Sequence, residues 1–78
     1  MLGEEVIKLI GANPKIMFGK PVVKGTRIPV DIILERLALG ESEEQIIVSY
    51  PALNKQAIQA CLYYAALNLR NETLLAVA

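Results

Sequence analysis

Histidine and tryptophan are absent from this 78-residue chain, and cysteine occurs only once. A single cysteine excludes a disulfide framework within one chain, and the lack of histidine excludes a Cys/His zinc site. Without imidazole, every catalytic dyad that depends on histidine is excluded as well. No cofactor motif and no nucleophile–base pair is visible, so we expect no enzyme activity, no metal, no cofactor and no small-molecule substrate.

Net charge is also lacking, because 8 Lys+Arg balance 8 Asp+Glu, whereas 54% of the residues are hydrophobic. The high apolar content argues against intrinsic disorder. A chain of this length forms one small domain, which buries only about 60% of the surface that its unfolded chain exposes. We therefore expect the apolar excess to be covered by a partner, most simply in a homodimer.

Long hydrophobic runs are missing too. The stretch Met1–Glu5 is acidic where a signal peptide needs a basic start, and the longest charge-free internal run, between Lys55 and Arg70, has 14 residues. A transmembrane helix needs about 20 mostly apolar residues. We expect no membrane segment and a cytoplasmic location, with which the single Cys61 agrees.

The charges are unevenly distributed along the chain: residues 1–5 sum to −2, 6–30 to +5, 31–50 to −4 and 51–78 to +1. The basic segment 6–30 also contains most of the glycines and prolines. One interpretation is a solvated surface followed by acidic helices. The other is that the basic segment contacts something acidic, either nucleic acid or the acidic helices of a second subunit.

The first 28 residues indicate extended structure with a tight turn. Residues 4–10 fit a short helix or a strand equally well, because periodicity cannot settle so short a run. Residues 15–28 are expected to be extended, with a hairpin turn at Lys24-Gly25 in which the glycine takes a positive φ. A lone hairpin is marginal in water, so this one must pair with residues 6–18 or with another chain.

From residue 29 the pattern predicts three helices. Pro29 suits the first position of the first helix, which Gly40 ends. Ser42 and Gln45 form a capping box for a short helix over 42–50, and Asn54 caps a third helix over 55–70. The predicted core stripe of the third helix is Ile58, Cys61, Leu62, Ala65 and Leu69, and a second apolar stripe is Ala57, Ala60, Tyr64 and Leu67. Of the adjacent Tyr63 and Tyr64, one is expected in the core and the other at an interface or groove.

The short connection Tyr50–Leu53 has the length expected in a helix-turn-helix unit, whose second helix enters the DNA major groove. Glutamine can read adenine edges, and lysine can reach guanine or phosphate. The zero net charge and the acids at the start of the 42–50 helix imply few phosphate contacts. A plain three-helix bundle with solvated polar residues is the alternative. The residues expected to face outward on the docking helix are Asn54, Lys55, Gln56, Gln59 and Tyr63.

The segment Gly19–Val30, GKPVVKGTRIPV, is the most specific motif. It is not a phosphate-binding loop, because Gly25 follows Lys24 instead of preceding it. Arg27 can pair with Asp31 or Glu35, or reach a phosphate, and we favour the structural pairing.

This segment resembles, without a break, the hallmark of a bacterial and archaeal family, domain of unknown function 433. The flanking matches are Ile10–Pro14, Gly40, Ser42–Ile46, Tyr50–Leu53 and Cys61–Ala65. The resemblance implies a homeodomain-like helix-turn-helix fold preceded by a β segment. It also implies an antitoxin that binds its own operator and blocks a toxin similar to a PIN-type ribonuclease.

We therefore predict a mainly α single domain over 1–78: a β arm used in dimerisation over 1–28, a three-helix bundle over 29–70 and a tail over 71–78. Besides the docking helix, the predicted DNA contacts are Lys20, Lys24 and Arg27. The predicted dimer or partner interface is Ile16, Phe18, Val22, Val23, Ala60, Tyr64 and Leu67. Two functions remain open: a dimeric DNA-binding regulator of the antitoxin type, and a homodimeric protein-interaction module that does not bind DNA.

Overall fold

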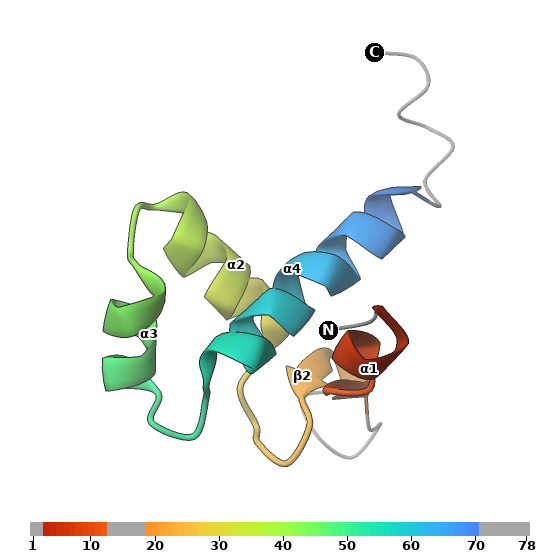
Figure 1. Ribbon diagram of the computed structural model, residues 1–78, viewed down its shortest axis with the longest axis horizontal. Coiled ribbons are helices and arrows are strands. Elements are labelled where there is room, and N and C mark those ends of the chain that lie inside the picture. Colours follow the sequence, from red (N-terminus) through yellow and green to blue (C-terminus); the bar gives the residue numbers. More distant parts are fainter. Residues whose placement is uncertain (1–2, 13–18, 71–78) are drawn as a thin grey trace.

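The computed structural model describes residues 3–12 and 19–70, which form a mainly helical chain with one small antiparallel sheet (Figure 1). The elements follow in the order α1 (Gly3–Ile7), β1 (Ile10–Ala12), β2 (Pro21–Val23), α2 (Val30–Ala38), α3 (Glu43–Ser49) and α4 (Lys55–Arg70). Residues 4–10, which fit either a helix or a strand, contain both: helix α1 ends at Ile7, and strand β1 begins at Ile10. None of the described helices combines the length and apolar character needed to cross a membrane.

The two strands pair antiparallel, with Ile10 opposite Val23, Gly11 opposite Val22 and Ala12 opposite Pro21. The Lys24 N–H extends the ladder by donating to the Leu9 carbonyl at 2.8 Å. The expectation that the extended segment must pair with residues 6–18 or with another chain is met by β1 of the same chain.

The predicted turn at Lys24-Gly25 is present, and Gly25 has a φ of 81°. The Thr26 hydroxyl donates to the Val23 carbonyl at 2.7 Å and accepts from the Ile28 N–H at 3.0 Å, which ties the turn together. Residues 26–28 do not form a full second strand, and only a bridge between Val22 and Pro29 follows the turn. The reason is that Pro29, which has no N–H to donate, lies just before α2.

Helix α2 begins one residue later than predicted. Pro29 is its extended N-cap residue, with φ −69° and ψ 144°, and Val30 is the first helical residue. At the other end, the Gly40 N–H donates to the Leu37 carbonyl and the Glu41 N–H to the Arg36 carbonyl. This hydrogen-bond pair and the φ of 98° at Gly40 define a Schellman motif, so the predicted role of Gly40 is confirmed.

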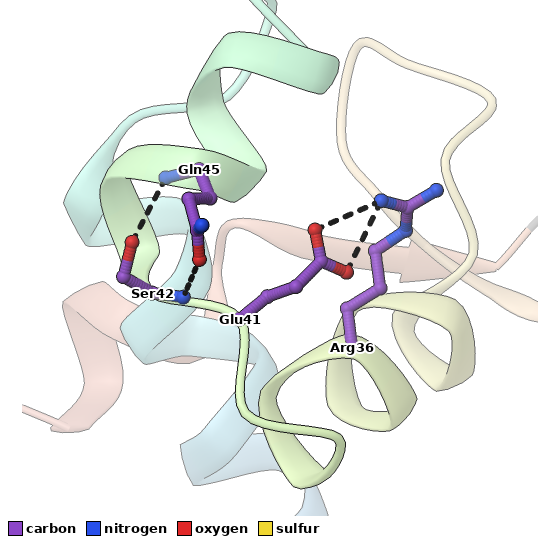
Figure 2. Close-up of polar contacts among 4 residues, drawn as sticks. All are labelled: Arg36, Glu41, Ser42 and Gln45. Carbon is purple, nitrogen blue, oxygen red and sulfur yellow. Dashed lines mark hydrogen bonds and ion pairs between the residues drawn. The ribbon is translucent and has the colours of Figure 1, made fainter.

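An ion pair accompanies the Schellman motif where a hydrophobic contact is more usual. The Arg36 Nη1 lies 3.2 Å from both carboxylate oxygens of Glu41, as Figure 2 shows. The guanidinium also lies over the Tyr50 ring, 5.0 Å from its centroid. These contacts connect the end of α2 to the end of α3.

Both predicted helix caps in the second half of the chain are confirmed. The Ser42 hydroxyl accepts from the Gln45 N–H at 3.1 Å while the Gln45 side chain accepts from the Ser42 N–H at 2.8 Å (Figure 2). The Asn54 Oδ1 accepts from the Ala57 N–H at 2.8 Å and starts α4 at Lys55, as expected. Both start positions follow because each cap satisfies an N–H that the helix itself leaves free.

The core lies where α2, α3 and α4 meet β2. Its largest fully buried side chains are Ile33, Ile46, Ile58 and Cys61. The predicted core stripe of α4 is wrong at two positions, because Leu62 is 48% exposed and Leu69 is 59% exposed. Helix α4 is longer than the helices beside it, and its C-terminal half runs outward past them (Figure 1).

Candidate nucleic-acid interface

The first two turns of α4 present polar side chains to solvent. Lys55, Gln56 and Gln59 are all exposed, while Ala57 and Ile58 between them are buried. Asn54 is also exposed, but its side-chain oxygen is already occupied as the helix cap. The structure therefore brings together three of the predicted docking residues, and it gives the fourth a structural function.

Lys55 forms an ion pair with Glu44 of α3, with 3.4 Å between Nζ and Oε1. The pKa of the Glu44 carboxyl is lowered, first by a hydrogen bond from the backbone N–H of Glu44 itself and second by the hydrogen bond and positive charge of Lys55. Both side chains are about two-thirds exposed, at 63% and 68%. Such exposed pairs contribute little to stability, so Lys55 can exchange this carboxylate for another anion at low cost.

Tyr63 does not face outward, and its predicted place on the docking surface is wrong. It is half-buried against α1, where a Cβ added to Gly3 would lie 2.5 Å from the Tyr63 hydroxyl oxygen. Helix α1 covers this side of α4, so a larger residue at position 3 would require the Tyr63 ring to shift. No feature of the sequence around Tyr63 indicates this distant contact.

The basic segment places Lys20, Lys24 and Arg27 in exposed positions. The Lys20 Nζ lies 2.7 Å from the Asp31 Oδ2, and this hydrogen bond is the main cause of the lowered pKa of Asp31. The favoured pairing of Arg27 with Asp31 or Glu35 is wrong, because Lys20 holds Asp31. Within residues 3–12 and 19–70, no ion pair involves Arg27 or Lys24.

The predicted partner interface is contradicted at three of its seven positions. Val22, Val23 and Ala60 are buried in the core of the chain itself, so their side chains are not available to a partner. Tyr64 and Leu67 are half-buried, and Tyr64 packs against the core. Ile16 and Phe18 lie outside the described residues.

The sequence reasoning missed the apolar side chains that are exposed. The large ones are Ile32 at 39%, Leu39 at 78%, Val48 at 80%, Leu62 at 48% and Leu69 at 59%. For Leu62 and Leu69 the sequence did contain a signal of exposure, because a 16-residue helix is longer than the predicted helices that could cover it.

Two observations on the described residues concern metal binding and thiol reactivity. They contain no cluster of three or more potential metal ligands. Burial raises the pKa of the Cys61 thiol to about 11, so it stays protonated near neutral pH and is a poor nucleophile. The exposed polar groups of the candidate interface are the start of α4 and the basic turn.

Comparison with known proteins identifies relatives without a described activity. A crystal structure of a DUF433 member protein from Anabaena variabilis ATCC 29413 superposes with a TM-score of 0.75 at 22% identity, covering 86% of this chain and 66% of that one. The uncharacterized protein y4eO of Sinorhizobium fredii is 34% identical over 61 residues, which are 78% of this chain and only 28% of y4eO. The family model described as protein of unknown function (DUF433) matches residues 10–65. The chain therefore belongs to the DUF433 family.

Proposed function

We propose that this chain binds duplex DNA as a homodimer, with α3 and α4 acting as a helix-turn-helix unit of the homeodomain-like kind and α4 entering the major groove. The observation that carries the proposal is the capped start of α4, where Lys55, Gln56 and Gln59 are exposed beside one another. A recognition helix reads bases with the residues of its N-terminal turns. These three side chains are therefore in the right part of the helix for base contacts.

The basic turn supplies a second contact in this proposal. Lys24 and Arg27 flank Gly25 and Thr26, and the Thr26 hydrogen bonds hold the turn in one conformation. In Figure 1 this turn and the loop that leads into α4 both lie along the lower edge of the view. We assign Gln56 and Gln59 to base edges, and Lys24 and Arg27 to phosphates.

The charge of the chain limits the strength of this binding. Net charge is zero, and two of the candidate cations, Lys20 and Lys55, already have carboxylate partners. Each phosphate contact adds about −0.9 to the slope of log K against log salt concentration for binding to duplex DNA. A few contacts per chain give a shallow salt dependence and weak non-specific binding, so specific base contacts must supply much of the discrimination.

The antitoxin role that the family resemblance implies is a more particular form of this proposal. In it, the DNA site is the chain's own operator, and the protein partner is a toxin of the PIN-like ribonuclease kind. Both remain proposals about the whole protein, because this chain spans only 28% of the length of the curated relative that it matches.

A protein-interaction module that does not bind DNA is the second candidate. The exposed Leu39, Val48, Leu62 and Leu69 favour it, since a protein partner that covers exposed apolar side chains removes their surface from water. In this case the basic turn would meet acidic side chains of a protein partner.

Fluorescence anisotropy separates the two functions. The chain is titrated onto a labelled duplex from upstream of its own coding sequence and onto a scrambled duplex, at about 50 and about 200 mM salt. DNA binding predicts preference for the first duplex and weakening with salt. Gln59→Ala should cost about 1–3 kcal/mol of binding free energy on the first duplex only, if the glutamine makes a bidentate base contact.

The matched control is Asn68→Ala, which removes another exposed amide from α4, at the opposite end of the helix. It should leave the affinity unchanged. Equal and weak binding to both duplexes would reject DNA reading and leave the protein-interaction module.

A further inference from the structure

The C-terminal half of α4 carries an apolar stripe, defined here as Leu62, Ala65, Ala66 and Leu69. Leu62 is 48% exposed and Leu69 is 59% exposed, Ala66 is exposed, and Ala65 is half-buried. These positions share one face, since residues three, four and seven apart are neighbours on a helix. The order Leu-Ala-Ala-Leu reads the same in both directions about the midpoint between Ala65 and Ala66.

We propose that the apolar stripe of α4 pairs antiparallel with the same stripe of a second copy of this chain. A two-fold interface has to be complementary to itself, and the symmetric order of the stripe meets this condition. In the antiparallel register Leu62 faces the second copy's Leu69, and the two alanines face each other. Their small side chains allow a close helix crossing, with the leucines packing on either side.

The charges on α4 select the antiparallel orientation. Only Lys55 and Arg70 are charged on this helix, both are basic, and they stand at its two ends. A parallel pair would place each of these cations beside its own equivalent, which is unfavourable. The antiparallel pair separates the two Lys55 residues and places Arg70 near Cys61 of the second copy.

The size of the apolar stripe sets the expected affinity of the dimer. Stable specific interfaces bury about 1,200–2,000 Å² in total, and a crossing of two helical turns from each chain buries less. We therefore expect a reversible dimer with a Kd on the order of tens of micromolar.

The antiparallel pair has a consequence for DNA that rests on the proposed function. Lys55 lies about ten residues from the centre of the stripe, so at 1.5 Å per residue the two Lys55 positions are roughly 32 Å apart. This separation is close to one turn of B-DNA, about 34–36 Å, which is the spacing of half-sites read by a two-fold dimer. Gln56 lies about 130° and Gln59 about 70° around the helix from the centre of the stripe, and both precede the stripe along α4, so pairing leaves them uncovered.

Sedimentation equilibrium between about 5 and about 500 µM tests the pairing without DNA. Leu62→Lys and Leu69→Glu should each raise the dimer Kd at least about tenfold, because each buries a charge without a partner. Mixing the two variants should restore a heterodimer, since the antiparallel register brings the new lysine against the new glutamate. A parallel pair would not be restored in this way.

Val48→Glu is the matched control, because Val48 is an exposed apolar residue, at 80%, outside the stripe. It should change the Kd less than about twofold, as expected for a surface substitution away from the contact. Circular dichroism confirms folding of each variant, and Leu69→Glu alone decides the matter if Leu62→Lys does not fold. A wild type that stays monomeric throughout, equal weakening by Val48→Glu, or no restoration on mixing would each overturn the proposal. A monomer destabilised by Leu69→Glu would show that the stripe is covered within the chain itself, which also overturns it.

A separate DNA titration keeps the two proposals distinguishable. Duplexes with two half-sites spaced about 10 or about 15 bp apart are compared with a single half-site. Preference for the 10 bp spacing that disappears in Leu69→Glu supports the antiparallel pair. If the chain dimerises as described but no duplex is preferred over scrambled DNA, the proposed function fails and the dimer contact stands.

Discussion

The structural role of the residue that caps α4 and its proposed role in DNA binding can be separated by two substitutions at one position. Asn54→Ala removes the oxygen that accepts from the Ala57 N–H at 2.8 Å. Losing such a cap costs about 1 kcal/mol, within a range of about 0.5–2 kcal/mol. For a domain of 60–100 residues, about 1 kcal/mol lowers Tm by roughly 4–8 °C. Asn54→Asp keeps the acceptor, and a carboxylate at a helix N-terminus is favourable, so its Tm should stay within about 2 °C of the wild type or rise.

Thermal and urea unfolding, followed by circular dichroism, measure both variants, and Asn68→Ala is the control. That substitution removes an exposed hydrogen bond to the Tyr64 carbonyl and should cost less than about 0.5 kcal/mol. Under the proposed docking of α4 in the major groove the order differs, because Asn54→Asp adds a negative charge near the DNA and should weaken binding despite intact stability. The cap assignment would be refuted if Asn54→Asp were as unstable as Asn54→Ala, or if Asn54→Ala were neutral.

Four further outcomes follow from the structure. Gly40→Ala should lower the free energy of unfolding by about 1 kcal/mol in urea titrations, because its φ of 98° is strained for alanine although the added Cβ meets no atom within 4 Å; a neutral result would contradict the Schellman motif. Ile58→Ala, at a fully buried position, should cost about 2–5 kcal/mol, and a loss below about 1 kcal/mol would mean that the site is not core. Cys61 should react with DTNB in urea but hardly at all in the native state at pH 8. The free energy of unfolding should fall as pH rises from the ordinary thiol pKa of 9.0 toward about 11, because only the unfolded thiol ionises in that window. Lys20 lowers the pKa of Asp31 below 3.8, so the small stabilising effect of this ion pair is present above pH 3.8 and disappears as pH falls through the lowered value. Asp31→Asn should abolish this change of stability on the acid side, and an unaltered pH profile would exclude the ion pair.

Many local features of this fold could be predicted from the sequence. Gly25 in its turn, Gly40 at the end of α2, the Ser42–Gln45 capping box and Asn54 at the start of α4 were all placed correctly. Each depends on hydrogen bonds or backbone angles within a few residues, so the residue types alone specify them. The candidate base contacts Lys55, Gln56 and Gln59 followed from the same helix start.

Relations between distant segments were decided only by the tertiary structure. Lys20, and not Arg27, forms the ion pair with Asp31, and the Tyr63 ring lies close to Gly3. Leu62 and Leu69 remain exposed because α4 extends beyond the helices beside it. Helical periodicity shows that a residue lies on an apolar face, but a face is buried only where another element covers it. The sequence by itself determined where each helix begins and how its turns close. The packing of α1, α2 and α3 around α4 decided which of its apolar side chains became core and which remained available to a partner.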